Sequence, residues 1–188
     1  MNVGSRVLRS RSVNINPNRK GHLNMARTVD NLMKMFTSVS ESNVRYMAFA
    51  EAADKEGHPN AAKIFRAVAT AKMFHAVSHF RATNLVDITT ENLKQALEEE
   101  IYDYKSAYPP MVQDAVNDEA IEGRYSLEYA MSIGPMIAKL ISKAIGNPDA
   151  DEDGSYYICP VCGDIEFGKP PIKCPFCGVD AGQFIEVS

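Results

Sequence analysis

Four segments of the chain carry apolar residues at helical spacing. In residues 28–54 the apolar positions recur at steps of three and four, which places them on one face of a helix. Residues 59–83, a segment from about 90 to 108, and residues 119–146 show the same pattern. The stripes include Leu32, Phe36, Val39, Tyr46 and Ala50, then Ile64, Phe65 and Val68, then Leu93, Leu97 and Ile101, and finally Ile133, Ile137, Leu140 and Ile141. Four amphipathic helices of similar length are buried most simply as a bundle.

Polar and helix-breaking residues interrupt these stripes at a few places. Lys72, His75 and His79 fall on the apolar face of the second helix. The pair Pro109-Pro110 is expected to bend or break the third helix, because proline lacks an N–H and its ring clashes with the preceding turn. Gly134-Pro135 predicts a kink or a local bulge in the fourth.

The last forty residues contain two Cys-x-x-Cys-Gly units. They read Cys159-Pro-Val-Cys162-Gly163 and Cys174-Pro-Phe-Cys177-Gly178, with eleven residues between Cys162 and Cys174. In each unit the glycine after the second cysteine can adopt a positive φ, so that backbone N–H groups approach the sulfurs. Two such units supply four thiolates in a tetrahedron, which suits iron or zinc. The spacing favours a metal site over a disulfide framework, and all four cysteines of the protein are used.

The spacing alone leaves the choice between iron and zinc open. The residues between the two units, together with Tyr156-Tyr157-Ile158 before them, resemble a rubredoxin-like module. This resemblance implies a single iron that cycles between two oxidation states by one-electron transfer, whereas zinc would make the module purely structural.

Composition and charge narrow the remaining possibilities. With 188 residues, 45% of them hydrophobic, the chain is long enough for one ordinary domain and a small one. Its net charge of −4 argues against nucleic-acid binding, and no apolar run is long enough to span a membrane. Residues 1–27 carry six Arg and Lys and no acid, and residues 148–188 carry eight Asp and Glu and two Lys. The two ends could attract each other within or between chains. The cysteines and the lack of a secretion signal favour the cytoplasm.

The order of these parts resembles the rubrerythrin and nigerythrin family. The run from Glu41 to Ala50, the following Ala52 to Gly57, Ile64-Phe65 and Tyr108-Pro109 carry the resemblance. It implies a mainly α protein with a ferritin-like four-helix bundle and a small C-terminal rubredoxin-like four-cysteine metal domain. The expected parts are an N-terminal extension (1–27), the bundle (28–147), a linker (148–154) and the metal domain (155–188).

In that family the bundle holds two irons, bound by a glutamate on the first helix and Glu-x-x-His, Glu-x-x-Glu and Glu-x-x-His on the others. Matched by position, this sequence keeps His75, Glu100 and Asp103. The other four positions hold Val39, Lys72, Gly134 and Ile137, which are not expected to bind a metal. We therefore expect Lys72 to replace the metal by charge, pairing with Glu100 or Asp103. A single metal on His75, Glu100 and Asp103 is the alternative.

Three functions follow from these expectations. The first is an iron-binding electron-transfer protein linked to peroxide or oxygen stress, acting with a redox partner protein as a homodimer or as a hetero-oligomer with a relative. The second is a peroxide-reducing oxidoreductase with an altered metal site in the bundle. The third is a structural or interaction protein whose four cysteines bind zinc. No nucleic acid or membrane partner is expected.

Overall fold

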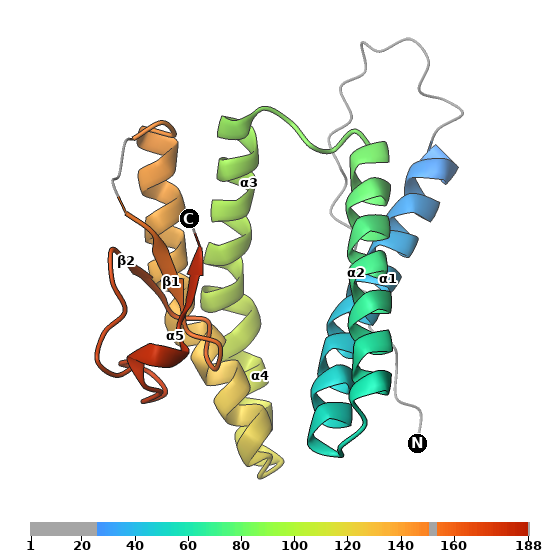
Figure 1. Cartoon of the computed structure of the whole chain (residues 1–188). Helices are drawn as coiled ribbons and strands as arrows, with labels where there is room; N and C mark the ends of the chain where they lie inside the picture. Colours follow the sequence, from blue (N-terminus) through green and yellow to red (C-terminus); the bar gives the residue numbers. More distant parts are fainter. Residues whose placement is uncertain (1–25, 151–153, 188) are drawn as a thin grey trace. The chain divides into compact units, whose positions relative to one another are not determined.

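The computed structural model describes residues 26–150 and 154–187, and the basic extension expected over 1–27 lies almost entirely outside them (Figure 1). The chain divides into two compact units, Met1–Val86 and Asp87–Ser188. The division falls inside the segment expected to form the bundle, and the domain boundaries proposed above stay predictions. The described residues include no helix long and apolar enough to cross a membrane.

The first unit is a hairpin of two long helices, α1 (Ala26–Lys55) and α2 (Pro59–Ala82). Gly57, at φ +80°, ends α1 in the left-handed conformation that glycine adopts without strain. The backbone N–H of His58 donates to the carbonyl of Ala53 (2.8 Å), which closes the last turn. Proline at Pro59 then opens α2, where its missing N–H costs nothing. The predicted bounds of both helices agree with the structure to within two residues.

Small residues form the contact between α1 and α2. Ala50, Ala53 and Ala62 are buried together, and the Phe65 ring packs against them. Ala69 and Ala76 continue this line along α2 at intervals of seven residues. The expected inner stripe of α2 is therefore only partly correct, because Phe65 follows the prediction while Ile64 remains 64% exposed. Alanine carries no large side chain, so the two helix backbones can approach closely.

The second unit begins with a long helix that changes type along its length. It comprises α3 (Thr89–Tyr102), a π-helical turn η2 (Asp103–Ala107) and α4 (Tyr108–Asn117). Pro109-Pro110, expected to bend or break the helix, do not end the helical segment: α3 gives way to η2 just before them, and both prolines lie in the first turn of α4. In η2 the N–H of Tyr108 donates to the carbonyl of Asp103. This i→i+5 bond widens the helix just before the prolines, where a regular turn would clash with the ring.

The rest of the second unit is α5 (Ile121–Gly146) and a small β module. Helix α5 stays α-helical through Pro135. The module contains β1 (Tyr156–Ile158), β2 (Ile165–Phe167), a 3₁₀ turn η3 (Ala181–Gln183) and β3 (Ile185–Val187). Its strands form an antiparallel sheet in the order β2-β1-β3.

Candidate metal centre

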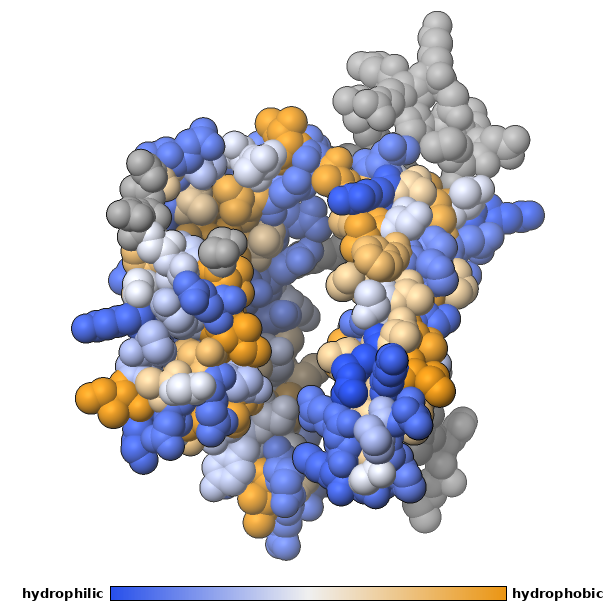
Figure 2. Space-filling model, in the orientation of Figure 1, coloured by the Kyte–Doolittle hydropathy of each residue, from blue (hydrophilic) through white to orange (hydrophobic). Residues whose placement is uncertain are grey.

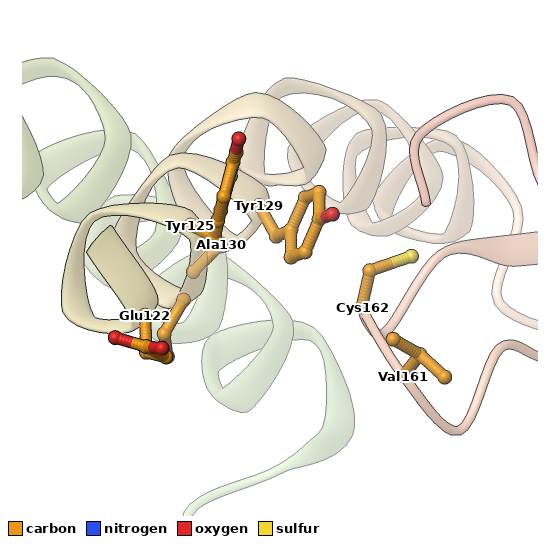
Figure 3. A pocket seen from close by; sticks show the side chains of 7 residues that line it. Glu122, Tyr125, Tyr129, Ala130, Val161 and Cys162 are labelled. Carbon is orange, nitrogen blue, oxygen red and sulfur yellow. The ribbon is translucent and has the colours of Figure 1, made fainter. Parts of the chain in front are cut away.

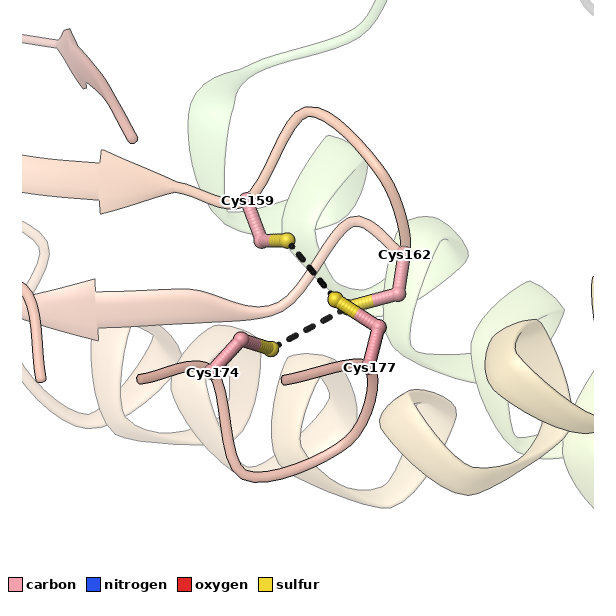
Figure 4. A group of neighbouring side chains, drawn as sticks. All are labelled: Cys159, Cys162, Cys174 and Cys177. Atoms are coloured by element: carbon pink, nitrogen blue, oxygen red, sulfur yellow. Dashed lines mark hydrogen bonds between the residues drawn. The ribbon is translucent and has the colours of Figure 1, made fainter. Parts of the chain in front are cut away.

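The four cysteines lie on two loops of identical construction at the end of the β module (Figure 4). In the first, the N–H of Gly163 donates to the carbonyl of Cys159 (3.0 Å), and in the second the N–H of Gly178 donates to the carbonyl of Cys174 (2.9 Å). The two glycines have φ values of +82° and +77°, so the positive φ expected at both positions is confirmed. The two Cys-x-x-Cys-Gly units thus form two turns of the same geometry.

The sulfur atoms converge on one point. The Sγ atoms of Cys159 and Cys177 are 3.5 Å apart, those of Cys162 and Cys174 are 3.4 Å apart, and all four lie within 4.8 Å of one another. A disulfide would need about 2.05 Å. A tetrahedral ion with metal–sulfur bonds of about 2.3 Å needs sulfurs roughly 3.8 Å apart. The four side chains therefore fit one tetrahedral metal ion and do not form disulfides. Among the described residues, this is the only group of three or more Cys, His, Asp or Glu side chains placed to share an ion.

The sulfurs differ in environment. Cys159 and Cys174 are buried, while Cys162 and Cys177 are half-buried. Burial raises the pKa of Cys159, but hydrogen bonds from the backbone of Cys162 and Val161 and from the side chains of Cys162 and Cys177 together outweigh it and lower the pKa to about 7. Burial also raises the pKa values of Cys162 and Cys177, and neighbouring sulfurs contribute to the rise. Four crowded thiols resist full ionisation on their own, and a cation among them would favour it.

A buried carboxylate borders the sulfurs. Asp164 follows the first loop directly, is 0% exposed, and its Oδ2 lies 3.6 Å from the Sγ of Cys174, which donates to it. Its backbone carbonyl accepts from the N–H of Cys159 (2.8 Å). The sequence does not single out this residue, since an aspartate next to a glycine ordinarily indicates an exposed turn.

A shallow cavity of about 490 Å³ lies between α5 and the first cysteine loop, within the second unit (Figure 3). The Tyr129 ring projects from α5 toward the loop that carries Val161 and Cys162, and Glu122, Tyr125, Ser126 and Ala130 complete the lining. Burial raises the pKa of Tyr129, and the sulfurs of Cys177 and Cys162 contribute. The half-buried Cys162 therefore lies at the cavity that faces α5. The sequence offered Tyr129 only as one tyrosine among eight.

Two of the retained family ligands lie together on the second unit. Glu100 is near the end of α3 and Asp103 begins η2, and both are half-buried. Burial raises the pKa of Glu100, and the charges of Asp103 and Glu99 raise it further. The positions on α5 offer no ligand atom, because Gly134 has no side chain and the half-buried Ile137 carries only hydrocarbon. A Cβ atom added at Gly134 would lie 2.7 Å from the Cβ of Tyr104, so the tyrosine already fills the space beside the glycine.

The remaining candidates belong to the first unit. Val39 is 4% exposed on α1, Lys72 is half-buried on α2, and His75 lies on the exposed side of α2. The rings of His75 and His79 are 6.4 Å apart. Because Lys72 and His75 belong to a different unit from Glu100 and Asp103, the expected Lys72 ion pair and the alternative single-metal site both stay predictions.

The architecture and the cysteine site together define a helical protein with a C-terminal tetrathiolate module, and comparisons with known proteins agree. The rubrerythrin family model matches residues 30–132. Rubrerythrin-2 of Clostridium acetobutylicum is 29% identical over 180 residues, covering 85% of this chain and 96% of the relative. Nigerythrin of Nitratidesulfovibrio vulgaris is 25% identical over 164 residues, covering 80% and 81%. A solved structure of nigerythrin in its fully reduced, all-ferrous state covers 100% of both chains with a TM-score of 0.51 at 23% identity.

The chain belongs to the rubrerythrin family. The expected fold class, a mainly α protein of the ferritin-like type with a small four-cysteine domain, is confirmed by the long helices, the cysteine cluster and the fold likeness to nigerythrin. The four cysteines predicted as a metal site are brought together as expected.

Proposed function

We propose that this protein is a rubrerythrin-like iron protein that transfers electrons through its tetrathiolate centre and has no intact diiron site. The observation that carries the proposal is the convergence of four sulfurs from two matched loops. When iron is bound by four thiolates, it supplies one-electron redox chemistry. Cys159, Cys162, Cys174 and Cys177 would hold the ion, and the half-buried Cys162 and Cys177 offer the shorter route to a redox partner protein.

Two features of the helices support the absence of a diiron site. Such a site needs several carboxylates to offset the repulsion between two cations. The first-helix position holds a buried valine, Val39, and the α5 positions hold Gly134, packed on Tyr104, and Ile137. The cluster of Lys72 with Glu100 or Asp103 remains part of this proposal. Under it the helical part acts as a scaffold, and a role in peroxide or oxygen stress in the cytoplasm rests on family membership.

Metal analysis with a visible spectrum tests the proposal. The protein as purified should contain about one iron per chain, and the oxidised form should be red because thiolate-to-ferric charge transfer absorbs visible light. Reduction should bleach the colour. One colourless zinc per chain would instead support a structural or interaction role, and two or three metals per chain would indicate a filled bundle site and a peroxide-reducing enzyme.

We further propose that the protein is a homodimer. Figure 2 shows apolar side chains at the surface of both units, and on the hairpin Val44, Ile64 and Phe74 are each more than 60% exposed. The hairpin has one face buried in its own α1–α2 contact, so these residues need another helical partner to leave water. Each side chain of this size contributes about 1.5 to 3 kcal/mol when buried. A second copy offers such a partner.

Light scattering checks the dimer directly. The wild-type protein should have twice the mass of one chain, and Ile64→Asp should shift it toward the monomer, because a carboxylate would be buried without a partner. Lys63→Asp is the matched control, since it places the same group on the neighbouring exposed position. A monomeric wild-type protein, or equal effects of both substitutions, would contradict the proposal. A heavier species of mixed composition would indicate a hetero-oligomer with a relative.

A further inference from the structure

Asp164 is an unusual residue in the β module because its carboxylate is fully buried. Its side chain is 0% exposed, and Oδ1 has no hydrogen-bond partner among the described residues. The only side-chain contact given for Oδ2 is the Sγ of Cys174, at 3.6 Å. A buried carboxylate without a cation is costly, so its presence requires a reason.

The surroundings of Asp164 are negative. Glu166, two residues further on, is half-buried, and burial together with the charge of Asp164 raises its pKa. The lysine nearest in sequence to the second cysteine loop, Lys173, lies at the surface, where its Nζ is 3.7 Å from the Oδ1 of Asp180. Among the described residues, no ion pair neutralises Asp164. The Cys174 sulfur is therefore the polar side-chain neighbour of its carboxyl group.

From this geometry we propose that Asp164 tunes the reduction potential of the four-cysteine centre, its buried negative charge favouring the oxidised ion. The inference rests on the proposed iron site. Reduction of bound ferric iron adds one electron and one negative charge to the site, and no bond to sulfur breaks. A carboxylate in contact with Cys174 repels that added charge. Because Asp164 is removed from water, solvent screens this repulsion little.

The test is the midpoint potential of iron-reconstituted full-length protein, measured by spectroscopic redox titration. Asp164→Asn keeps the size of the side chain and removes the charge. At a fixed solution potential, we expect the ratio of oxidised to reduced centre to change at least tenfold. For a one-electron couple this corresponds to a rise in midpoint potential of about 59 mV. Asp164→Ala should also raise the potential, since it removes the same charge without adding an N–H donor.

Asp180→Asn is the matched control. It removes the same charge from the same module, but its side chain is 72% exposed, so its potential should match the wild type. A midpoint potential that rises in Asp164→Asn but not in Asp164→Ala would assign the effect to hydrogen bonding and overturn the inference. Equal midpoint potentials in the wild type and in all variants would overturn it too. So would iron loading that fails only in the two Asp164 variants, because Asp164 would then have a structural role. The proposed function is judged separately, on the metal present before reconstitution.

Discussion

Cys174→Ser should abolish metal binding and unfold the β module while leaving the helices intact. The module has almost no hydrophobic core, since its three strands are three residues long and its buried residues are Cys159, Asp164 and Cys174. The ion and its thiolates must therefore supply most of the stabilisation. Apparent binding free energies of structural zinc sites are about 10 to 16 kcal/mol, more than a fold of about 35 residues supplies from its core.

Elemental analysis and limited proteolysis measure this effect. The metal content should fall from about one ion per chain to less than about a tenth of that, and residues 154–187 should become the preferred site of cleavage. Far-UV circular dichroism should lose little, because the helices lie outside the module. Val161→Ser is the control: it places serine between the two ligands of the first loop, at a side chain that is 58% exposed. A Cys174→Ser protein that keeps its metal and its resistance to protease would refute the central role of the site.

The metal site could be predicted from the sequence because its geometry is local. Each pair of cysteines, with the glycine that follows, forms one turn, and the backbone bonds of that turn involve only neighbouring residues. The long helices were predictable for the same reason, since a period of three to four residues is a short-range signal. Only the meeting of the two loops depends on the fold, and a shared ion makes that meeting favourable.

Some features of the fold could not be predicted from the sequence. The contact between α1 and α2 uses alanines such as Ala53 and Ala62, whereas apolar periodicity gave more weight to Ile64 and Val68. The sequence predicted a bend or break at Pro109-Pro110, because the known effect of proline on a regular α-helix does not include a widened π-helical turn before it. Asp164 has the sequence context of a surface aspartate, yet it is buried and its carboxyl group contacts Cys174 of the second cysteine loop. For the alanines and for Asp164 the deciding contact comes from another segment of the chain, whereas the π-helical turn is set by a bond between residues five apart.

Substitution of Gly134 tests whether Tyr104 fills the space beside this position of α5, where the family resemblance implies a glutamate. A Cβ at this position would lie 2.7 Å from the Cβ of Tyr104 in η2, closer than two carbon atoms can pack. The Tyr104 atom is attached directly to the backbone, so a change of rotamer cannot relieve the contact and η2 or α5 must move. Overpacking of this kind costs about 1 to 3 kcal/mol. We therefore expect Gly134→Ala to lower the free energy of unfolding, even though alanine favours a helix over glycine by about 1 kcal/mol.

Gly123→Ala provides the opposite result on the same helix. A Cβ at Gly123 meets only the Cβ of Ala120, at an ordinary 3.7 Å, so this substitution should stabilise the protein by up to about 1 kcal/mol. Urea unfolding of the two variants should thus give changes of opposite sign. Gly134→Ala that proves as stabilising as Gly123→Ala would mean that Tyr104 does not occupy this space.

The same contact bears on the proposal that the diiron site is absent. The combined substitutions Val39→Glu, Lys72→Glu, Gly134→Glu and Ile137→His introduce the ligands that the family resemblance implies at these positions. A glutamate at position 134, however, meets Tyr104 even more severely than alanine does. We expect the four substitutions to bind little additional iron. Adding Tyr104→Gly, which removes the obstructing Cβ, should raise the iron content above that of the fourfold variant. If the fourfold variant already binds two further irons per chain, the loss of ligands alone explains the altered site and the packing of Tyr104 is incidental.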